Sequence, residues 1–390
     1  MRRIFITVAI LAVSSTLLFT PAHAKKITGV IYHDANKNAL SNYEQQLDPA
    51  DVLLPNIDVY LLTSSDKRST KTSEYGTFTF ADVSAGTYLL VFGIDPKYGC
   101  TSHNRAIRIP EAIREGHVDV VAIGDSIGVL GSDRPYPVRL AEHFSNIVDT
   151  TLDNLAIGGS ASWEWLPGAD KGYFDDRLVP ALPDADVVTI TLGGNDLAPY
   201  VSGGPPYDPI EIVKAFIENP YFILDIIPNI KAIIEKIREL NPDCDVVFVV
   251  YPNFGNSHFI SDYVDGTLQQ LVSFAMKVGM SIAREEVGKI KNVVLADMFG
   301  ALGDSSLDPY LIDVVHPNDA GHQLYADVIF MSLGGVLLGD ESSNDSRLVG
   351  FDAPDLVPDD DSQDDDSGDD ASDDDGGHEN NSNAGCGLSI

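Results

Sequence analysis

Residues 27 to about 95 alternate apolar and polar side chains in the manner of β-strands. Turn residues such as Gly76 and Gly86 separate four short runs rich in β-branched and aromatic residues. The runs are residues 27–32, 57–61, 77–80 and 87–91. Short strands at this spacing are typical of a small antiparallel β-sandwich.

The pattern changes at His117, where apolar runs begin to alternate with helical periodicity. Buried strands are expected at residues 118–123, 185–192, 245–251 and 292–296. Apolar residues at three- and four-residue steps predict helices at residues 210–217, 223–240, 268–290 and 318–333, with Pro228 as a break or kink in the second. Apolar strands that alternate with helices predict a three-layer α/β/α domain, in which a parallel sheet is covered on both faces. Active-site loops of such domains lie at the carboxyl ends of the strands.

The N-terminal residues have the pattern of a secretory signal peptide. Two arginines precede an apolar run that ends near Phe19 and is followed by Ala22-His23-Ala24. This order predicts a signal peptide over residues 1–24 and a mature chain that starts at Lys25. A membrane anchor is the alternative, but the run is short for a span of about 20 residues. The protein is therefore expected to be secreted, periplasmic or at the cell surface, with no transmembrane anchor after cleavage.

Acidic residues dominate the charge, and they crowd the C-terminal end. The net charge is −34, and residues 348–390 carry 14 acidic side chains and no Lys or Arg. Periodicity stops after about Asp340, so residues 341–390 are expected to form a disordered acidic tail. The final residues also fit the start of a longer sorting signal. Because phosphate binding requires Lys and Arg, nucleic acid is not expected as a partner.

Cysteines do not define the architecture. The sequence has three, and Cys100 and Cys244 lie in regions that are expected to fold. Export permits a disulfide between them, and the sequence leaves that pairing open.

The first strand of the α/β region ends in Gly124-Asp125-Ser126. A serine on a sharp strand-to-helix turn is exposed, and the helix that follows offers its dipole and free N–H groups to developing negative charge. A turn whose serine caps a helix is the alternative. Gly124 to Gly128 also fits Gly-x-Ser-x-Gly, the α/β-hydrolase elbow, but too little sheet precedes Ser126 for that fold.

Three further blocks strengthen the motif. They are Asn154-Leu155-Ala156-Ile157-Gly158-Gly159-Ser160, Thr191-Leu192-Gly193-Gly194-Asn195-Asp196 and Asp313-Val314-Val315-His316-Pro317-Asn318. With all four blocks in order, residues 117–335 resemble the SGNH (GDSL-like) hydrolase family.

The resemblance implies roles for five residues. Ser126 would be the nucleophile, His316 its general base, and Asp313 the group that orients the imidazole. The Ser126 N–H, the Gly159 N–H and the Asn195 amide would form an oxyanion hole.

Neighbouring residues offer alternatives. Gly158 competes with Gly159 for the oxyanion role, and Asp125 and Asp196 are expected to be structural. A metal site on Asp313, His316 and His322 is disfavoured, because no His-x-x-x-His or Cys-x-x-Cys spacing supports zinc.

The N-terminal region has a resemblance of its own. Residues 29–38, 54–61 and 75–88 make residues 27–95 similar to SdrD B-like and Cna-B-like surface modules. That resemblance implies a Ca²⁺ site on Asp34, Asn36 and Asn38, because oxygen ligands at alternate positions suit a hard cation. Ala39, Asn42 and Gln45 depart from the family pattern, so an Asx-rich turn is the alternative.

The expected organisation is a module at residues 25–100, a linker at 101–116 and a catalytic domain at 117–340. The expected function is a serine ester hydrolase that works through an acyl-serine without a cofactor. Substrates are small-molecule, carbohydrate or lipid esters, with carbohydrate O-acetyl esters favoured. A lipase or lysophospholipase activity stays open. So does a surface-binding protein whose module contacts a cell surface or polysaccharide and whose hydrolase domain is secondary or inactive.

Overall fold

The computed structural model describes most of the chain between residues 25 and 357. The described ranges are 25–36, 47, 49–95, 98–100, 116–201, 209–219, 222–262, 264–290, 292–339 and 344–357. The expected signal peptide, residues 1–24, and the Asp-rich tract, residues 359–375, lie outside them. Within the described ranges, no helix combines the length and the apolar character needed to cross a membrane.

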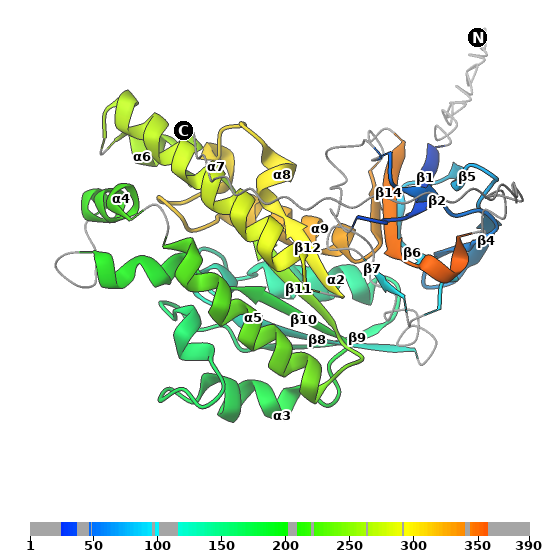
Figure 1. The fold of residues 1–390 in the computed structure, drawn as a ribbon, viewed down its shortest axis with the longest axis horizontal. Coiled ribbons are helices and arrows are strands. Elements are labelled where there is room, and N and C mark those ends of the chain that lie inside the picture. The colour runs from blue at the N-terminus through cyan, green and yellow to red at the C-terminus, as the bar shows by residue number, and fades with distance from the viewer. Residues whose placement is uncertain are drawn as a thin grey trace, which may run out of the picture. The chain divides into compact units, whose positions relative to one another are not determined.

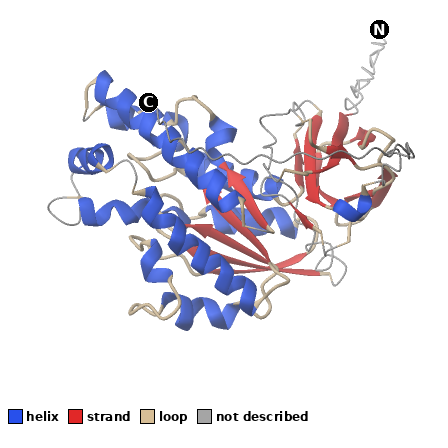
Figure 2. Cartoon of the chain, in the orientation of Figure 1, coloured by secondary structure: helices blue, strands red, loops and turns tan. Residues whose placement is uncertain are grey.

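A β-sandwich accounts for the N-terminal part (Figure 2). Its strands there are β1 (Lys25–His33), β2 (Val52–Leu53), β3 (Asp58–Leu62), β4 (Lys67–Lys71), β5 (Thr77–Val83), β6 (Gly86–Phe92) and β7 (Gly99–Cys100). One sheet has the order β2-β1-β14-β7, with β5 also paired to β1, and the other has the order β13-β6-β3-β4. Alternate residues of β1, β3 and β5 are buried. The rings of Phe78 in one sheet and Phe92 in the other lie 6.1 Å apart in the shared core.

Two strands of this sandwich come from beyond the α/β domain. β13 (Gly335–Leu338) pairs antiparallel with β6, and β14 (Asp345–Asp352) pairs parallel with β1. The expectation that regular structure stops near Asp340 is therefore wrong, and the sandwich is not confined to residues 25–100. The physical reason is the short apolar run at residues 348–351, which is inconspicuous among acidic residues. Within it, Phe351 is fully buried and its ring lies 6.0 Å from that of Phe92.

The α/β domain is built on five parallel strands. They are β8 (His117–Gly124), β9 (Asp149–Asn154), β10 (Val187–Thr191), β11 (Asp245–Val250) and β12 (Val293–Asp297), in the order β12-β11-β10-β8-β9. Every residue of β10, β11 and β12 is buried, as a sheet covered on both faces requires. The predicted parallel sheet is confirmed.

Helices cover both faces of that sheet (Figure 1). α2 (Tyr136–Ser145) and α9 (Asp319–Ser332) pack together on one face, and α5 (Ile223–Leu240) and α7 (Gly266–Gly288) pack together on the other. Shorter helices are α3 (Val179–Ala181), α4 (Pro209–Glu218), α6 (His258–Ser261) and α8 (Met298–Leu302). α5 continues through Pro228, and its buried face is a stripe of seven isoleucines.

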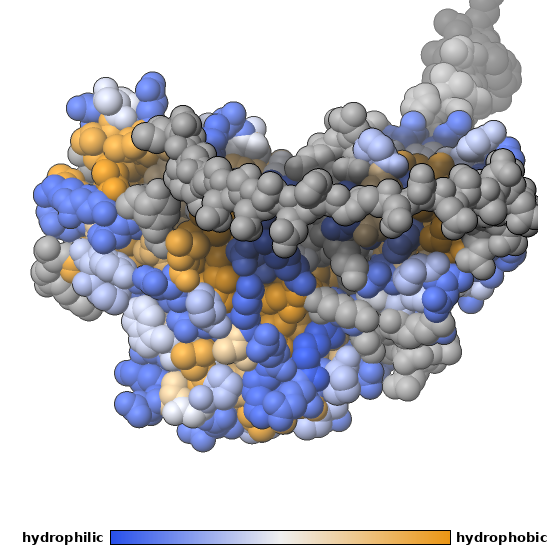
Figure 3. All heavy atoms as spheres, viewed as in Figure 1, coloured by the Kyte–Doolittle hydropathy of each residue, from blue (hydrophilic) through white to orange (hydrophobic). Residues whose placement is uncertain are grey.

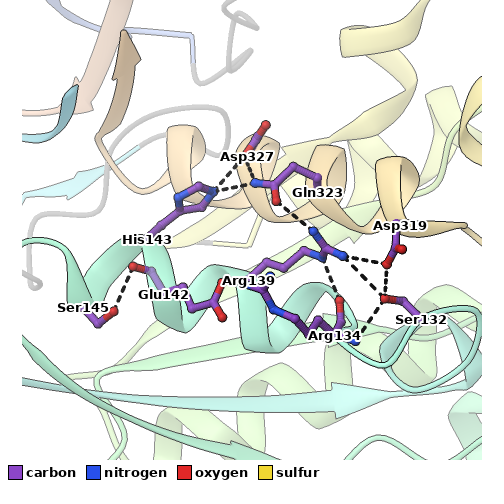
Figure 4. A network of polar contacts seen from close by, with 9 residues as sticks. All are labelled: Ser132, Arg134, Arg139, Glu142, His143, Ser145, Asp319, Gln323 and Asp327. Atoms are coloured by element: carbon purple, nitrogen blue, oxygen red, sulfur yellow. Dashed lines mark hydrogen bonds and ion pairs between the residues drawn. The ribbon is translucent and has the colours of Figure 1, made fainter. Parts of the chain in front are cut away.

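Ion pairs and hydrogen bonds join α2 to α9 (Figure 4). Arg139 Nη2 donates to Asp319 Oδ1 at 2.7 Å, and Arg139 Nη1 donates to Gln323 Oε1 at 3.1 Å. Farther along both helices, His143 Nε2 lies 2.7 Å from Asp327 Oδ1. Asp319 is the first residue of α9, so these contacts hold the amino end of that helix against α2.

His322 makes a second connection, and it is fully buried. The Tyr136 N–H donates to His322 Nδ1 at 3.1 Å, so the proton lies on Nε2, which donates to Leu130 O at 2.7 Å. Burial lowers the pKa of His322, which keeps the ring neutral. His322 therefore links α9 to the segment that follows Ser126.

Arg347 on β14 joins the sandwich to the end of α9. Its buried guanidinium donates to Gly335 O at 2.6 Å, to Met331 O at 3.3 Å and to Asp345 Oδ2 at 2.9 Å. These partners lie on β13, α9 and β14, so one side chain satisfies acceptors on three elements.

Replacing Arg347 with Ala should lower the free energy of unfolding by about 2–4 kcal/mol, because the partly buried Asp345 carboxylate and the carbonyls of Met331 and Gly335 would lose their donor. Chemical denaturation measures this change. The matched control is Arg134→Ala, which removes an ion pair from a side chain that is 56% exposed, and it should cost less than about 1 kcal/mol. Equal losses in the two variants would contradict the bridging role of Arg347.

Candidate active site

The site lies at the carboxyl end of β8, where the order of the sheet reverses. β8 is flanked by β9 on one side and β10 on the other, so the connections from β8 and β9 leave in opposite directions. Crevices form at such switch points in parallel sheets. Gly124 ends β8 opposite Thr191 of β10, and a side chain on Gly124 would collide with Thr191. Glycine thus lets the two strands approach just before Ser126.

Ser126, His316 and Asp313 form one hydrogen-bonded line. Ser126 Oγ lies 2.9 Å from His316 Nε2, and His316 Nδ1 lies 2.7 Å from Asp313 Oδ2. A carboxylate only accepts, so Nδ1 carries the proton and donates to it, and Nε2 accepts from the serine. Asp313 Oδ1 also accepts the backbone N–H groups of Val315 and His316 at 3.0 and 2.8 Å. The line joins two residues 190 positions apart in the sequence.

Electrostatics in this line favour a basic imidazole. The hydrogen bond to Asp313 raises the pKa of His316 above its ordinary value and outweighs the opposing effect of burial. Burial alone would raise the pKa of Asp313, but hydrogen bonds from the His316 side chain and from two backbone N–H groups lower it overall. Asp313 thus remains a carboxylate while His316 exchanges a proton.

Asp125 anchors the turn that carries Ser126. Its Oδ1 accepts the Ile127 N–H at 2.9 Å, and its Oδ2 accepts the Tyr251 hydroxyl at 3.0 Å. Burial raises the pKa of Asp125 to about 6, although these two hydrogen bonds lower it in part. The structural role expected for Asp125 agrees with these contacts.

The loop after β9 brings backbone donors beside the serine. The Ile157 N–H and Ser160 Oγ both donate to Gly124 O, at 2.9 and 3.0 Å. Gly159 lies between them with φ +82°, a conformation that favours glycine. Neither the Gly159 N–H nor the Ser126 N–H donates to another described residue, so both stay available to a ligand.

Asn195 follows β10 and points toward the same loop. Its Nδ2 donates to Ser160 O at 3.0 Å, which orients the amide beside residues 159–160 and leaves its second hydrogen for a ligand. Asp196 accepts from the Ser162 N–H at 2.8 Å and from the Ser162 hydroxyl. Burial raises the pKa of Asp196 to about 6. Asp196 thus ties the two loops together, in line with the structural role expected for it.

The structure brings together all five residues that the sequence indicated, and it adds others. Ser160, the last residue of the second motif block, helps to position the site. Ser162, Tyr251 and His322 also position it, although no sequence spacing marks them as functional. Trp165 is fully buried, and its indole N–H donates to Ser160 Oγ at 3.0 Å. That indole packs the loop.

Two further expectations concern metal and cysteine. Asp34 is buried at the end of β1 and Asn36 lies in the following turn, whereas Asn38 is outside the described residues. Among described residues, no cluster of three His, Cys, Asp or Glu side chains could hold a metal ion. Cys244 is buried, with its Sγ 3.4 Å from Asn241 O, and the Cys100 side chain is outside the described residues, so the pairing that the sequence left open stays untested.

Comparisons with known proteins fit this geometry. A family model described as "GDSL-like Lipase/Acylhydrolase family" matches residues 122–324. The uncharacterized protein YpmR of Bacillus subtilis (strain 168) is 25% identical over 240 residues, which cover 60% of this chain and 88% of that protein.

Solved structures with a similar fold include lipases and an esterase. The lipase Lip_vut3 from a goat rumen metagenome is 19% identical, with a TM-score of 0.42 and coverage of 56% of this chain and 98% of that one. An extracellular lipase from Streptomyces rimosus is 18% identical, with a TM-score of 0.41 and coverage of 55% and 99%. A mutant acetyl-xylooligosaccharide esterase from Geobacillus is 16% identical, with a TM-score of 0.38 and coverage of 56% and 94%. Since the family model matches more than half of the sequence and all its motif blocks, the chain belongs to the GDSL-like lipase/acylhydrolase family.

Proposed function

We propose that the protein hydrolyses carboxylic esters through an acyl-Ser126 intermediate. The observation that carries the proposal is the hydrogen-bonded line from Ser126 Oγ through His316 to Asp313. A serine alone is a weak nucleophile, and an adjacent base oriented by a third group is the usual way of activating it. Family membership supports the same class of reaction.

Acylation begins with attack of Ser126 Oγ on the ester carbonyl carbon. His316 Nε2 takes the serine proton as the bond forms, and the carbonyl oxygen becomes an oxyanion. The Ser126 N–H, the Gly159 N–H and the Asn195 amide stabilise this charge. When the tetrahedral intermediate collapses, the bond to the alcohol breaks and His316 returns the proton to the departing oxygen.

Deacylation repeats these steps with water. His316 removes a proton from the water as its oxygen attacks the acyl carbon, and the same three donors stabilise the second oxyanion. Collapse releases the acid and returns the proton to Ser126 Oγ. Asp313 keeps the imidazole in the tautomer that accepts at Nε2, and its charge stabilises the imidazolium formed in both steps.

We also propose that this chemistry takes place outside the cytoplasm. The support is the sequence of residues 1–24, which reads as a cleavable signal. The N-terminal sandwich, with its resemblance to surface modules, would then hold the enzyme near a cell surface or polysaccharide. Ca²⁺ on Asp34, Asn36 and Asn38 is part of the same resemblance and stays a prediction.

Ser126→Ala should reduce the hydrolysis of p-nitrophenyl butyrate by about 10⁴-fold or more, because the nucleophile is lost. Steady-state kinetics on protein with unchanged circular dichroism measures the effect. Ser145→Ala, an exposed serine at the end of α2, serves as the control and should match the wild type. Equal rates in the wild type and Ser126→Ala would rule out the proposed nucleophile.

Asn195→Ala should lower kcat by about 10²–10³-fold with little change in KM, because the amide acts on the oxyanion rather than on the ground state. The exposed Asn146→Ala provides a comparison. If Asn195→Ala raises KM alone, the side chain binds substrate and does not stabilise the transition state.

Asp313→Asn should move the acidic limb of the kcat/KM profile to lower pH. His316 must be neutral to act as a base, and the carboxylate that raises its pKa is gone in the variant. The variant should also lose about 10²–10⁴-fold in kcat through the wrong tautomer. Rates measured from pH 4 to 9 test both effects, and an unshifted limb would mean that Asp313 does not act on the titrating group.

A further inference from the structure

A narrow apolar cavity begins at Ser126 and runs into the interior of the α/β domain. Its volume is about 200 Å³. The walls come from the carboxyl half of β11, from the segment that follows β10 and from the inner faces of α4, α5 and α7. Ser126, Asn195 and Val315 line one end, which places that end at the candidate active site.

The cavity extends away from the serine along α7. This helix leads from the carboxyl end of β11 back to the amino end of β12, so Val272 lies near the site and Val287 lies toward the opposite edge of the sheet. Both residues line the cavity, as do Met280 and Ala283 between them. Fifteen helical residues span about 22 Å at 1.5 Å each. Because its lining residues are spread along α7 in this way, we treat the cavity as elongated and call it the channel.

Polarity is confined to the end that carries the serine. The polar side chains of the lining are Asp125, Ser126, Asn195 and Tyr251, and Asp125 and Tyr251 bond each other. Every other lining side chain is aliphatic, Phe or Met. A sugar inside this channel would leave its hydroxyl groups without partners, which is costly. An alkyl chain needs no such partners and gains from leaving water.

The outer surface near this end of the sheet is also apolar. Figure 3 shows hydrophobic surface over the region of α6 and the start of α7. Leu268, Leu271 and Phe274 on the first half of α7 are exposed, Phe274 by 63%. A substrate with an alkyl chain would therefore meet apolar surface outside as well as inside.

We infer that this channel is the acyl-chain pocket, and that the preferred substrates are esters of unbranched acids of medium chain length. The inference rests on the proposed acyl-Ser126 chemistry and names the part of the substrate that enters the protein. An apolar cavity of about 150 Å³ holds the six carbon atoms of benzene, so in proportion a cavity of about 200 Å³ holds about eight carbon atoms. That capacity corresponds to an octanoyl group, and it departs from the small or carbohydrate acetyl esters that the sequence favoured. The alcohol stays outside, at the polar end.

The first test compares p-nitrophenyl acetate, butyrate, hexanoate, octanoate, laurate and palmitate. Each added methylene should raise kcat/KM by up to about fourfold until the channel is full. We expect a rise of at least tenfold from acetate to octanoate and a maximum between hexanoate and laurate. A flat profile, or a maximum at acetate, overturns the pocket while leaving the ester hydrolase intact, provided that the activity depends on Ser126.

Two variants probe the channel in opposite directions. Ala283→Phe adds a phenyl ring. Since benzene occupies an apolar cavity of about 150 Å³, this ring would fill most of the channel, and the ratio of kcat/KM for octanoate to kcat/KM for acetate should fall at least tenfold. Met280→Ala lengthens or widens the channel and should move the maximum toward laurate or palmitate. Ser281→Phe places the same ring on the exposed side of α7 and should leave the ratio unchanged. Unchanged profiles in both channel variants contradict the assignment.

Binding separates the pocket from the chemistry. Calorimetric titration of octan-1-ol and butan-1-ol into the Ser126→Ala protein needs no turnover. We expect octan-1-ol to bind at least tenfold more tightly than butan-1-ol, and Ala283→Phe to abolish the difference. If octan-1-ol binds more tightly than butan-1-ol but the wild-type protein hydrolyses no ester, the acyl-chain pocket is supported and the proposed function is refuted. Equal binding of the two alcohols would refute the pocket.

Discussion

The hydrogen bond between Ser126 and His316 is the contact on which the whole site depends. It joins the carboxyl end of the central strand β8 to a loop 190 residues later. The distance between Ser126 Oγ and His316 Nε2 therefore depends on the packing that holds these two segments together. That packing is supplied by α2 and α9, through the Arg139–Asp319 ion pair and through buried His322, which donates to Leu130 just beyond the serine. A catalytic hydrogen bond of this kind needs such supporting contacts to hold its distance.

Two buried carboxylates, Asp125 and Asp196, lie in the loops of the candidate site, and their burial lowers the stability of the fold. Burial raises the pKa values of Asp125 and Asp196 to about 6, which means that their charged forms are less stable here than in water. Each is held by directed hydrogen bonds to a neighbouring loop, Asp125 to Ile127 and Tyr251, and Asp196 to Ser162. The arrangement exchanges some stability for loops of defined position, which is a common feature of active sites.

The β-sandwich and the α/β domain share chain segments rather than following one another. β13 and β14 leave the end of α9 and complete both sheets of the sandwich, and Arg347 bonds to Met331 at that junction. The core of the β-sandwich therefore includes strands that follow the α/β domain in the chain. This connectivity limits how independently the two parts can fold, because β1 lacks its parallel partner until residue 345 is in place.

The sequence by itself indicated most elements of the α/β domain and the candidate catalytic residues. Strand and helix periodicity is local, so four of the five parallel strands and the long helices α5 and α7 could be predicted with the correct type. The spacing of Asp313 and His316 is local too, and the four motif blocks marked Ser126, Gly159 and Asn195 without any structure.

Tertiary structure decided what depends on contacts between distant segments. The neutral tautomer of His322 follows from partners on α2 and on the loop after Ser126, far from it in the chain. The pairing of β14 with β1 required a partner more than 300 residues away for a short apolar run among acidic residues. The apolar periodicity of α5 and α7 in the sequence indicates which face of each helix is buried. Whether those faces close against the sheet or leave a channel depends on side-chain volumes summed over several elements, a property that no single stretch of sequence contains.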